Sequence, residues 1–252
     1  MSASKTSFLI ALSLVVVLSG CSSRAGWQYQ ASATRVAAAP APVVVGVEHF
    51  QDKRGTENSR YFWVCVIPLV PYCTSTYKQL ENANGFLTEA AYNFRPSDDL
   101  AKATADELQQ AGLFQEVYVT DRPSDPNANL LLRGTVLNTD WVGTQYSYLV
   151  SGYAGVFYLL GLPIGTVDDS LSLTLELVNN ANGQVLWRHE ITGHYEKTEG
   201  FYYNYAQDFG YPQMFHEGIA PAISELQNFV NSQPPTFWTE MHKPAGALNQ
   251  RE

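Results

Sequence analysis

The chain has 252 residues, a formal net charge of −9, 45% hydrophobic residues and 13% aromatic residues. This composition provides enough apolar material for one sizeable core. An acidic chain lacks the basic footprint of a nucleic-acid-binding protein, and it lacks a polybasic surface for anionic lipids. We therefore expect no nucleic-acid partner and no electrostatic attachment to a membrane.

Residues 1–20 have the pattern of a secretory signal peptide. Lys5 gives a positive start, and an apolar run follows from Phe8 to Leu18. The run is too short to span a bilayer, which takes about 20 apolar residues, and small residues end it. We expect this segment to be removed from the mature protein.

The end of the signal, Leu18-Ser19-Gly20-Cys21, resembles the lipobox of bacterial lipoproteins. The resemblance implies cleavage between Gly20 and Cys21, a diacylglycerol thioether on Cys21 and an N-acyl chain on its new amine. Two or more acyl chains anchor a protein stably. An incidental cysteine after an ordinary secretory signal is the alternative. Because Ser22 is not the aspartate that retains enteric lipoproteins in the inner membrane, the resemblance favours the periplasmic face of the outer membrane.

The rest of the chain divides by composition. Residues 21–42 are rich in Ala, Ser and Pro and predict a flexible tether after the lipidated cysteine. Residues 43–232 predict one globular domain, which begins with the β-branched strand Val43–Phe50. Residues 233–252 predict a polar, poorly ordered tail.

The globular part predicts an α+β fold: a single domain with a mostly antiparallel sheet and about two helices packed on one face. A long segment without clear periodicity, residues 51–93, follows the first strand, and such segments are often functional. The elements expected after it are a helix opened by Pro96 and capped by Gly112, strands over Leu113–Thr120, Asn129–Trp141 and Ser170–Val178, an Asn182-Gly183 turn, a strand from Val185, and a helix from about Gln213 to Asn231.

Two cysteines remain once Cys21 is assigned to the lipid. Cys65 and Cys73 flank a proline-containing loop in a compartment that permits disulfides, so we favour a disulfide between them. Two buried thiols are the alternative. No further His or Cys spacing completes a zinc site, and we expect neither a metal nor a cofactor other than the acyl groups.

Several short patterns in this chain resemble a broad class of small envelope lipoproteins. They are Asp52 and Arg54 after the first strand, Gly112-Leu113-Phe114 between a helix and a strand, and Leu132, Gly134 and Val136 in the third strand. The class includes auxiliary lipoproteins of ABC-type transporters, the curli-secretion lipoprotein and the amino-terminal domain of the Tol-system periplasmic protein. The resemblance implies a non-enzymatic scaffold or export role. Two insertions, residues 61–77 and 148–164, depart from the class.

Catalytic motifs are missing from the sequence. His189-Glu190 and His216-Glu217 begin like zinc-protease motifs, but Gly193 and Ala220 stand where the second histidine must be. No G-x-S-x-G elbow, P-loop or dinucleotide-binding pattern is present. We therefore expect no enzymatic activity.

Two apolar stretches are candidates for an interaction surface. Tyr146–Gly165 carries no charge, and it either packs under the sheet or forms an exposed surface for a partner, another protomer or the membrane. Gly200–Phe215 is rich in tyrosine, and its rings either roof the core or serve an interface. The candidate residues are Tyr153, Phe157, Tyr158, Tyr202, Tyr203 and Tyr205. We also hypothesise that the two insertions pack together.

The sequence thus predicts a lipid-anchored, periplasm-facing outer-membrane lipoprotein. It would act without catalysis as a binding or assembly component of an envelope transport or secretion system, with an envelope protein or further copies of itself as partner. The alternatives are a lipid-anchored enzyme acting on envelope polymers and an oligomeric secretion-pore subunit.

Overall fold

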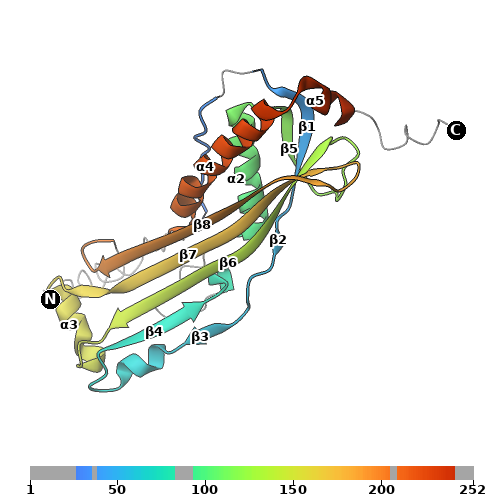
Figure 1. Ribbon diagram of the computed structural model, residues 1–252. Helices are drawn as coiled ribbons and strands as arrows, with labels where there is room; N and C mark the ends of the chain where they lie inside the picture. The colour runs from blue at the N-terminus through green and yellow to red at the C-terminus, as the bar shows by residue number, and fades with distance from the viewer. Residues whose placement is uncertain (1–26, 36–38, 83–92, 205–208, 242–252) are drawn as a thin grey trace, which may run out of the picture.

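Three long strands run side by side through the length of the molecule: β6 (Leu130–Tyr146), β7 (Pro163–Asn179) and β8 (Val185–Gly200) (Figure 1). The computed structural model describes residues 27–35, 39–82, 93–204 and 209–241. The predicted signal peptide and Cys21 lie outside these ranges.

The two edges of β6 determine the topology of the sheet. One edge pairs antiparallel with β7, from Leu130 opposite Asn179 to Gln145 opposite Gly165. The other edge is shared along its length by parallel β1 (Ala41–Glu48), parallel β2 (Gln51–Asp52) and antiparallel β4 (Tyr72–Tyr77). β5 (Phe114–Thr120) joins β1 and β3 (Asn58–Arg60) joins β4, giving one mixed sheet of eight strands.

One face of this sheet is apolar and covered by helices. Along β7, the leucines at 171, 173, 175 and 177 are buried, and the Ser, Thr and Glu residues between them point the other way. α2 (Pro96–Ala111) and α4 (Tyr211–Ser232) pack on the apolar face. The predicted α+β class, with mostly antiparallel pairing and two main helices on one face, is confirmed.

Glycines permit the close approach of α4 to β8. A Cβ on Gly218 would lie 2.3 Å from Ile191 Cγ2, and a Cβ on Gly193 would lie 2.6 Å from Met214 Cβ. These separations are shorter than any real contact between carbon atoms. The absence of a side chain at both positions therefore fixes how deeply the helix sits on the sheet.

The predicted flexible tether is wrong over residues 27–35, which lie against the body. The Trp27 ring stacks on Phe94 with 5.3 Å between centroids. The buried Glu107 carboxylate accepts hydrogen bonds from the Tyr29 hydroxyl, from the Ser32 N–H (3.1 Å) and from the Ala33 N–H (2.8 Å). Aromatic burial and a charged acceptor outweigh the tether-like composition of the segment.

The predicted polar tail is also wrong at its start. Residues Pro235–Met241 form a short helix, α5, which lies beside β1. Trp238 is buried, and Phe237 packs edge-on against Phe229 of α4. The adjacent prolines mark the turn between α4 and α5, because proline suits the first turn of a helix. Residues 242–252 lie outside the described ranges.

The buried Arg54 connects the end of β2 to a 3-10 turn near residue 81 and to β6. The Arg54 guanidinium donates to Asp52 (2.8 Å), to Glu81 (2.5 Å) in η2 (Leu80–Asn82) and to the Thr139 hydroxyl (2.6 Å) of β6. Hydrogen bonding to Arg54 lowers the pKa of the Asp52 carboxyl below its ordinary value. The Asp52–Arg54 pattern noted in the sequence is thus a structural ion cluster.

We expect Arg54→Met to destabilise the fold by on the order of 3 kcal/mol at pH 7, because it leaves Asp52 and Glu81 without their cation. Since the folded-state pKa of Asp52 is lowered, the contribution of this pair is present above the unfolded pKa of about 3.9 and is lost as pH falls below it. Urea unfolding of wild type and variant at pH 7 and pH 3 measures this.

Arg188→Met is the matched control, because Arg188 is an exposed partner of Glu176 and such pairs contribute about 1 kcal/mol or less. An Arg54→Met penalty of the same size at both pH values would contradict the assignment.

Candidate functional site

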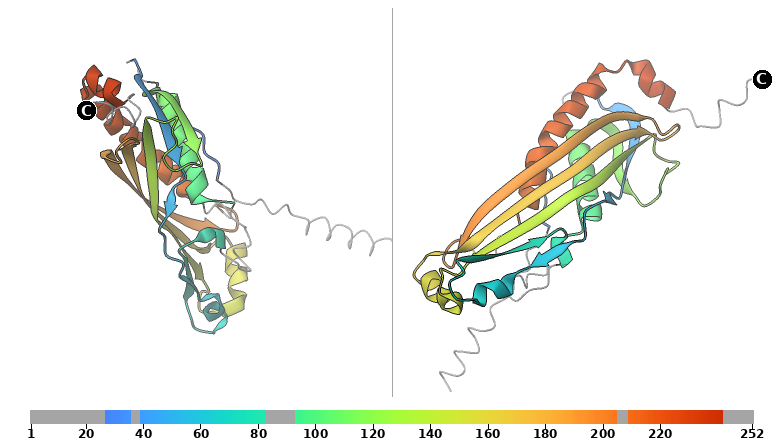
Figure 2. Two further views of the ribbon diagram at one scale, coloured as in Figure 1. Left: turned by 90° about the vertical axis from the view of Figure 1, so that its right-hand side faces the viewer. Right: turned by 60° about the horizontal axis from the view of Figure 1, so that its bottom comes forward.

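The sheet extends well beyond the helices that cover it. α4 begins where Gly210 packs against Tyr195, and the Gly210 N–H donates to Asp169 (2.9 Å). β8 continues from Tyr195 to Gly200, about 17 Å further at the rise of a strand. In Figure 2 this extension ends at α3 (Gly155–Leu159) and at the η1 loop (Phe62–Val66), far from α5.

We call residues 61–72, 147–162 and 200–204 the tip. The tip contains η1, the 3-10 turn η3 (Ser151–Ala154), α3 and the bend after β8. It therefore combines both insertions noted in the sequence with the start of the tyrosine-rich stretch.

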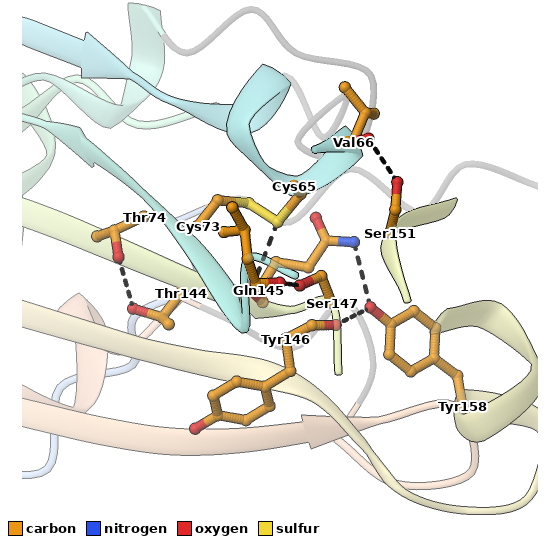
Figure 3. Close-up of a disulfide and its surroundings, with 11 residues drawn as sticks. Cys65, Val66, Cys73, Thr74, Thr144, Gln145, Tyr146, Ser147, Ser151 and Tyr158 are labelled. Carbon is orange, nitrogen blue, oxygen red and sulfur yellow. Dashed lines mark hydrogen bonds between the residues drawn. A yellow bond between two sulfur atoms is a disulfide. The ribbon is translucent and has the colours of Figure 1, made fainter. Parts of the chain in front are cut away.

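A disulfide closes the first of these segments. Cys65 and Cys73 are joined, with 5.3 Å between their Cα atoms, and both are buried (Figure 3). Cys73 lies in β4, so the bond fastens the η1 loop to the sheet. The Cys65 sulfur also lies 3.6 Å from the Gln145 carbonyl oxygen of β6.

Hydrogen bonds join the two insertions, which confirms the hypothesis that they pack together. The Leu69 N–H donates to Leu149 O (3.1 Å), the Ser147 N–H to Pro71 O (2.9 Å), and the Ser151 hydroxyl to Val66 O (2.6 Å). Figure 3 shows the last of these bonds beside the disulfide. The tip is thus a built structure and not a pair of loose loops.

The third segment is attached to the second. The Tyr202 hydroxyl donates to Leu159 O (2.9 Å), and the Tyr148 hydroxyl donates to Pro163 O (2.7 Å) at the start of β7. Pro163 opens its strand, a position that needs no ladder N–H. Gly165 follows because a Cβ there would lie 2.0 Å from Thr144 O of β6.

Large apolar side chains stand exposed over the whole tip. They are Tyr61, Trp63, Val66, Ile67, Leu69, Tyr72, Leu149, Tyr153, Val156, Leu159, Leu160, Leu162, Phe201, Tyr202 and Tyr203. Exposure reaches 81% for Tyr153, 78% for Leu69 and 71% for Leu160. An exposed apolar group of this extent marks an interaction surface.

The tip carries no ionisable side chain of Lys, Arg, Asp, Glu or His in any of its three segments. The flanking charges are Arg60, Asp168 and Glu199, which lie at the strand positions leading into it. The tip is therefore uncharged, whereas the rest of the chain carries the formal net charge of −9.

Backbone strain also concentrates in the tip. In the described part of the chain, six residues other than glycine have positive φ, and five of them are tip residues: Leu69, Tyr148, Leu149, Ser151 and Asn204. Such a conformation costs on the order of 1 kcal/mol per residue, and it persists at functional sites where the surroundings enforce it. At Leu69 and Leu149 the strained backbone holds an apolar side chain in solvent.

The predicted interaction residues divide within the tip. Tyr153, Tyr202 and Tyr203 are exposed, whereas Phe157 and Tyr158 are half-buried. The Tyr158 hydroxyl donates to the Tyr146 carbonyl, so this ring braces α3 against β6. Tyr205 lies outside the described residues.

Within Tyr146–Gly165, the helix α3 does not pack under the sheet, because none of its residues is buried, whereas Ser147 and Ala154 before it are buried. Sequence reasoning missed Trp63, Leu69 and Leu160 as surface residues. The signal for Trp63 and Leu69 was present in the uncharged run from Tyr61 to Cys73, which the disulfide fastens to the end of the sheet, and the signal for Leu160 was present in the uncharged stretch Tyr146–Gly165.

Titratable pairs elsewhere connect structural elements. His49 lies between Asp98 Oδ1 (2.7 Å) at the start of α2 and Asp121 Oδ1 (2.6 Å) after β5, and its hydrogen bond to Asp121 is the main cause of its raised pKa. His189 meets Glu225 of α4 (2.5 Å). Within the described ranges no group of His, Cys, Asp and Glu is arranged to hold a metal ion.

No helix in the described ranges is long and apolar enough to cross a membrane. No protein-family model matches the chain, and no curated protein sequence matches it.

Solved structures with a similar fold include lipoproteins. Protein XCC0632 from Xanthomonas campestris, with family model DUF330, has a TM-score of 0.45 and 10% identity, over 82% of this chain and 96% of that chain. A PelC dodecamer from Paraburkholderia phytofirmans has a TM-score of 0.34 and 16% identity, over 78% and 94%. Lipoprotein GNA1162 from Neisseria meningitidis has a TM-score of 0.28 and 14% identity, over 73% and 97%. At these TM-scores the function has to be argued from the chain's own residues.

We expect replacement of the disulfide in the Cys65→Ser/Cys73→Ser variant to loosen the tip and leave the body intact. Closing a loop of this length stabilises by about 2–3 kcal/mol, so amide hydrogen exchange at Leu69 and Ser147 should accelerate at least about tenfold. Exchange at Leu173, in the covered part of β7, should not change. Equal protection of the Leu69 and Ser147 amides with and without the disulfide would contradict this.

Proposed function

We propose that this protein is a lipid-anchored, non-catalytic component of the bacterial envelope that binds a hydrophobic envelope component through its tip. The anchor is the acylated Cys21, on the periplasmic face of the outer membrane. The protein serves in the assembly of an envelope transport or secretion system. The exposed, uncharged apolar tip is the observation that carries this proposal.

The interactions that hold the tip's apolar side chains in solvent support a binding role for the tip. Its apolar side chains are held outward by a disulfide, by hydrogen bonds between the insertions and by strained backbone. Folding alone would favour burying these side chains, since each large one gains about 1.5–3 kcal/mol when removed from water. Their exposure is therefore explained by a component that covers them.

The contacts of residues 27–35 determine how closely an anchor on Cys21 would hold the domain to the membrane. Residues 27–35 are bound to the body through Trp27 and the buried Glu107. An anchor on Cys21 would consequently hold the domain at short range, within six residues of a fixed point. The His49 and His189 pairs described above connect secondary-structure elements to one another. Such pairs are typical of a structural role for charged side chains.

We expect Cys21→Ser to abolish incorporation of labelled fatty acid and to release the protein from the membrane fraction. Acyl chains provide the attachment in this proposal, and the serine hydroxyl cannot form the thioether. Fractionation of cells on a density gradient measures both the release and the membrane of residence. A Cys21→Ser protein that stays in the outer-membrane fraction would contradict the lipid anchor.

Ser22→Asp tests the sorting step separately. In this variant acylation should persist, and the protein should move toward the inner-membrane fraction. An unchanged distribution would remove the argument from Ser22 for the outer membrane and leave the anchor itself untouched.

A photo-crosslinking amino acid at Tyr153 tests the binding surface in intact cells. Val185 is the matched control, because it is an exposed apolar residue at the opposite end of β8. Adducts at position 153 with an envelope component, absent at position 185, are the expected result. A ladder of cross-linked copies would instead support the oligomeric pore subunit, and no adduct at 153 would contradict the tip as a binding surface.

A further inference from the structure

We infer that the tip's ligand is the lipid bilayer: the tip enters the interfacial region of the same membrane leaflet that holds the acyl chains of Cys21. This inference rests on the proposed function, and it names the component that covers the tip. Proteins and second copies of the chain are the alternatives that the test distinguishes.

The charge pattern favours lipid. A bilayer interface accepts apolar and aromatic side chains, while an ionised group moved toward the hydrocarbon carries a penalty of a few kcal/mol. The tip contains no Lys, Arg, Asp, Glu or His in three segments that are far apart in the chain. Charged residues of the kind that fix the orientation of a protein interface begin only outside these segments, at Arg60, Asp168 and Glu199.

The composition of the tip also suits the interface. Trp and Tyr are enriched at the head-group level, where the ring is apolar and its N–H or hydroxyl meets water. Trp63, Tyr153 and Tyr202 are strongly exposed at the tip. The most exposed aliphatic side chains, Leu69 and Leu160, belong to the same tip. Fluid lipid can surround exposed apolar side chains without a matching pocket.

The position of the anchor makes simultaneous contact feasible. Residues 27–35 run along α2 from its start, where the Trp27 N–H donates to Asn93 O (3.0 Å), toward its end, where the Arg35 side chain lies near Gly112. Trp27, the first described residue, therefore lies at the end of the helical layer that faces the tip. Phe94 stacks on Tyr211, so the starts of α2 and α4 lie together at this level.

The lengths agree. From Tyr195, beside the start of α4, β8 runs about 17 Å to the tip. Cys21 precedes Trp27 by six residues, which span at most about 20 Å when extended. The acylated cysteine can thus reach the level of the tip, and the two attachments can share one membrane surface. The acyl chains raise the local concentration of the tip at that surface, so individually weak apolar contacts suffice.

The test uses the purified, lipidated full-length protein in vesicles of phosphatidylethanolamine and phosphatidylglycerol. A polarity-sensitive fluorophore is placed on Leu160→Cys or, as the matched control, on Val185→Cys, with the native disulfide left oxidised. Lipids brominated on the acyl chains serve as quenchers. We expect a blue-shifted, quenched probe at position 160 and a water-exposed, unquenched probe at position 185.

A second variant keeps the test independent of the labelled residue. Trp63→Glu/Leu69→Glu adds charge at two exposed side chains, so the body should keep its native hydrogen exchange while the Leu160 probe loses its quenching. A Leu160 probe that stays in water on these vesicles overturns the bilayer inference. If position 153 then still captures an envelope protein in cells, the proposed function stands without the inference, and if it captures nothing, both fall.

Discussion

The structure depends on the pairing of β6, β7 and β8 beyond the helical layer. A strand leaves its N–H and C=O groups in need of partners, and the antiparallel ladder from Leu130 to Gln145 supplies them along the whole of β6. On the other edge of β6, β1 ends and β4 takes over. The helices cover this ladder only as far as Asp169 of β7 and Tyr195 of β8. The uncovered ends of the three strands place the tip away from the core.

The two edges of the sheet beside the long strands, β8 on one side and β4 with β3 on the other, are protected in different ways. β8 pairs only with β7 in the described sheet, and its outward positions carry Arg188, Glu190 and Glu196, which discourage a further strand from adding. On the opposite side, β4 and short β3 close the edge near the disulfide. The exposed large apolar side chains are concentrated at the tip, and in the described part of the chain Val119, Leu137 and Val185 are the ones outside it.

The sequence predicted most of what periodicity can report. Leucines that alternate with polar residues from Leu171 gave the buried face of β7, and the helix ended by Gly112 at φ 68° was foreseen from its cap. Strand ends were not foreseen, because β7 begins at Pro163 and passes through Gly165, residues that locally argue against a strand. The burial of Trp27, Tyr29 and Trp238 was missed as well. Their partners lie far away in the chain, and composition alone assigned their segments to a tether and a tail.

The contacts that hold residues 27–35 against the body limit how the domain can be oriented relative to the proposed anchor. Were these residues a free tether, the domain could turn in any direction, and an apolar tip would meet the membrane only by chance. Glu107 and Phe94 hold the segment against α2, and its first described residue, Trp27, lies at the end of α2 that is nearer the tip. If the proposed anchor and the tip share one leaflet, the long strands stand up from the membrane. In that orientation the polar face of the sheet, with Glu176 and Arg188, would be turned sideways to the membrane and left uncovered by the bilayer.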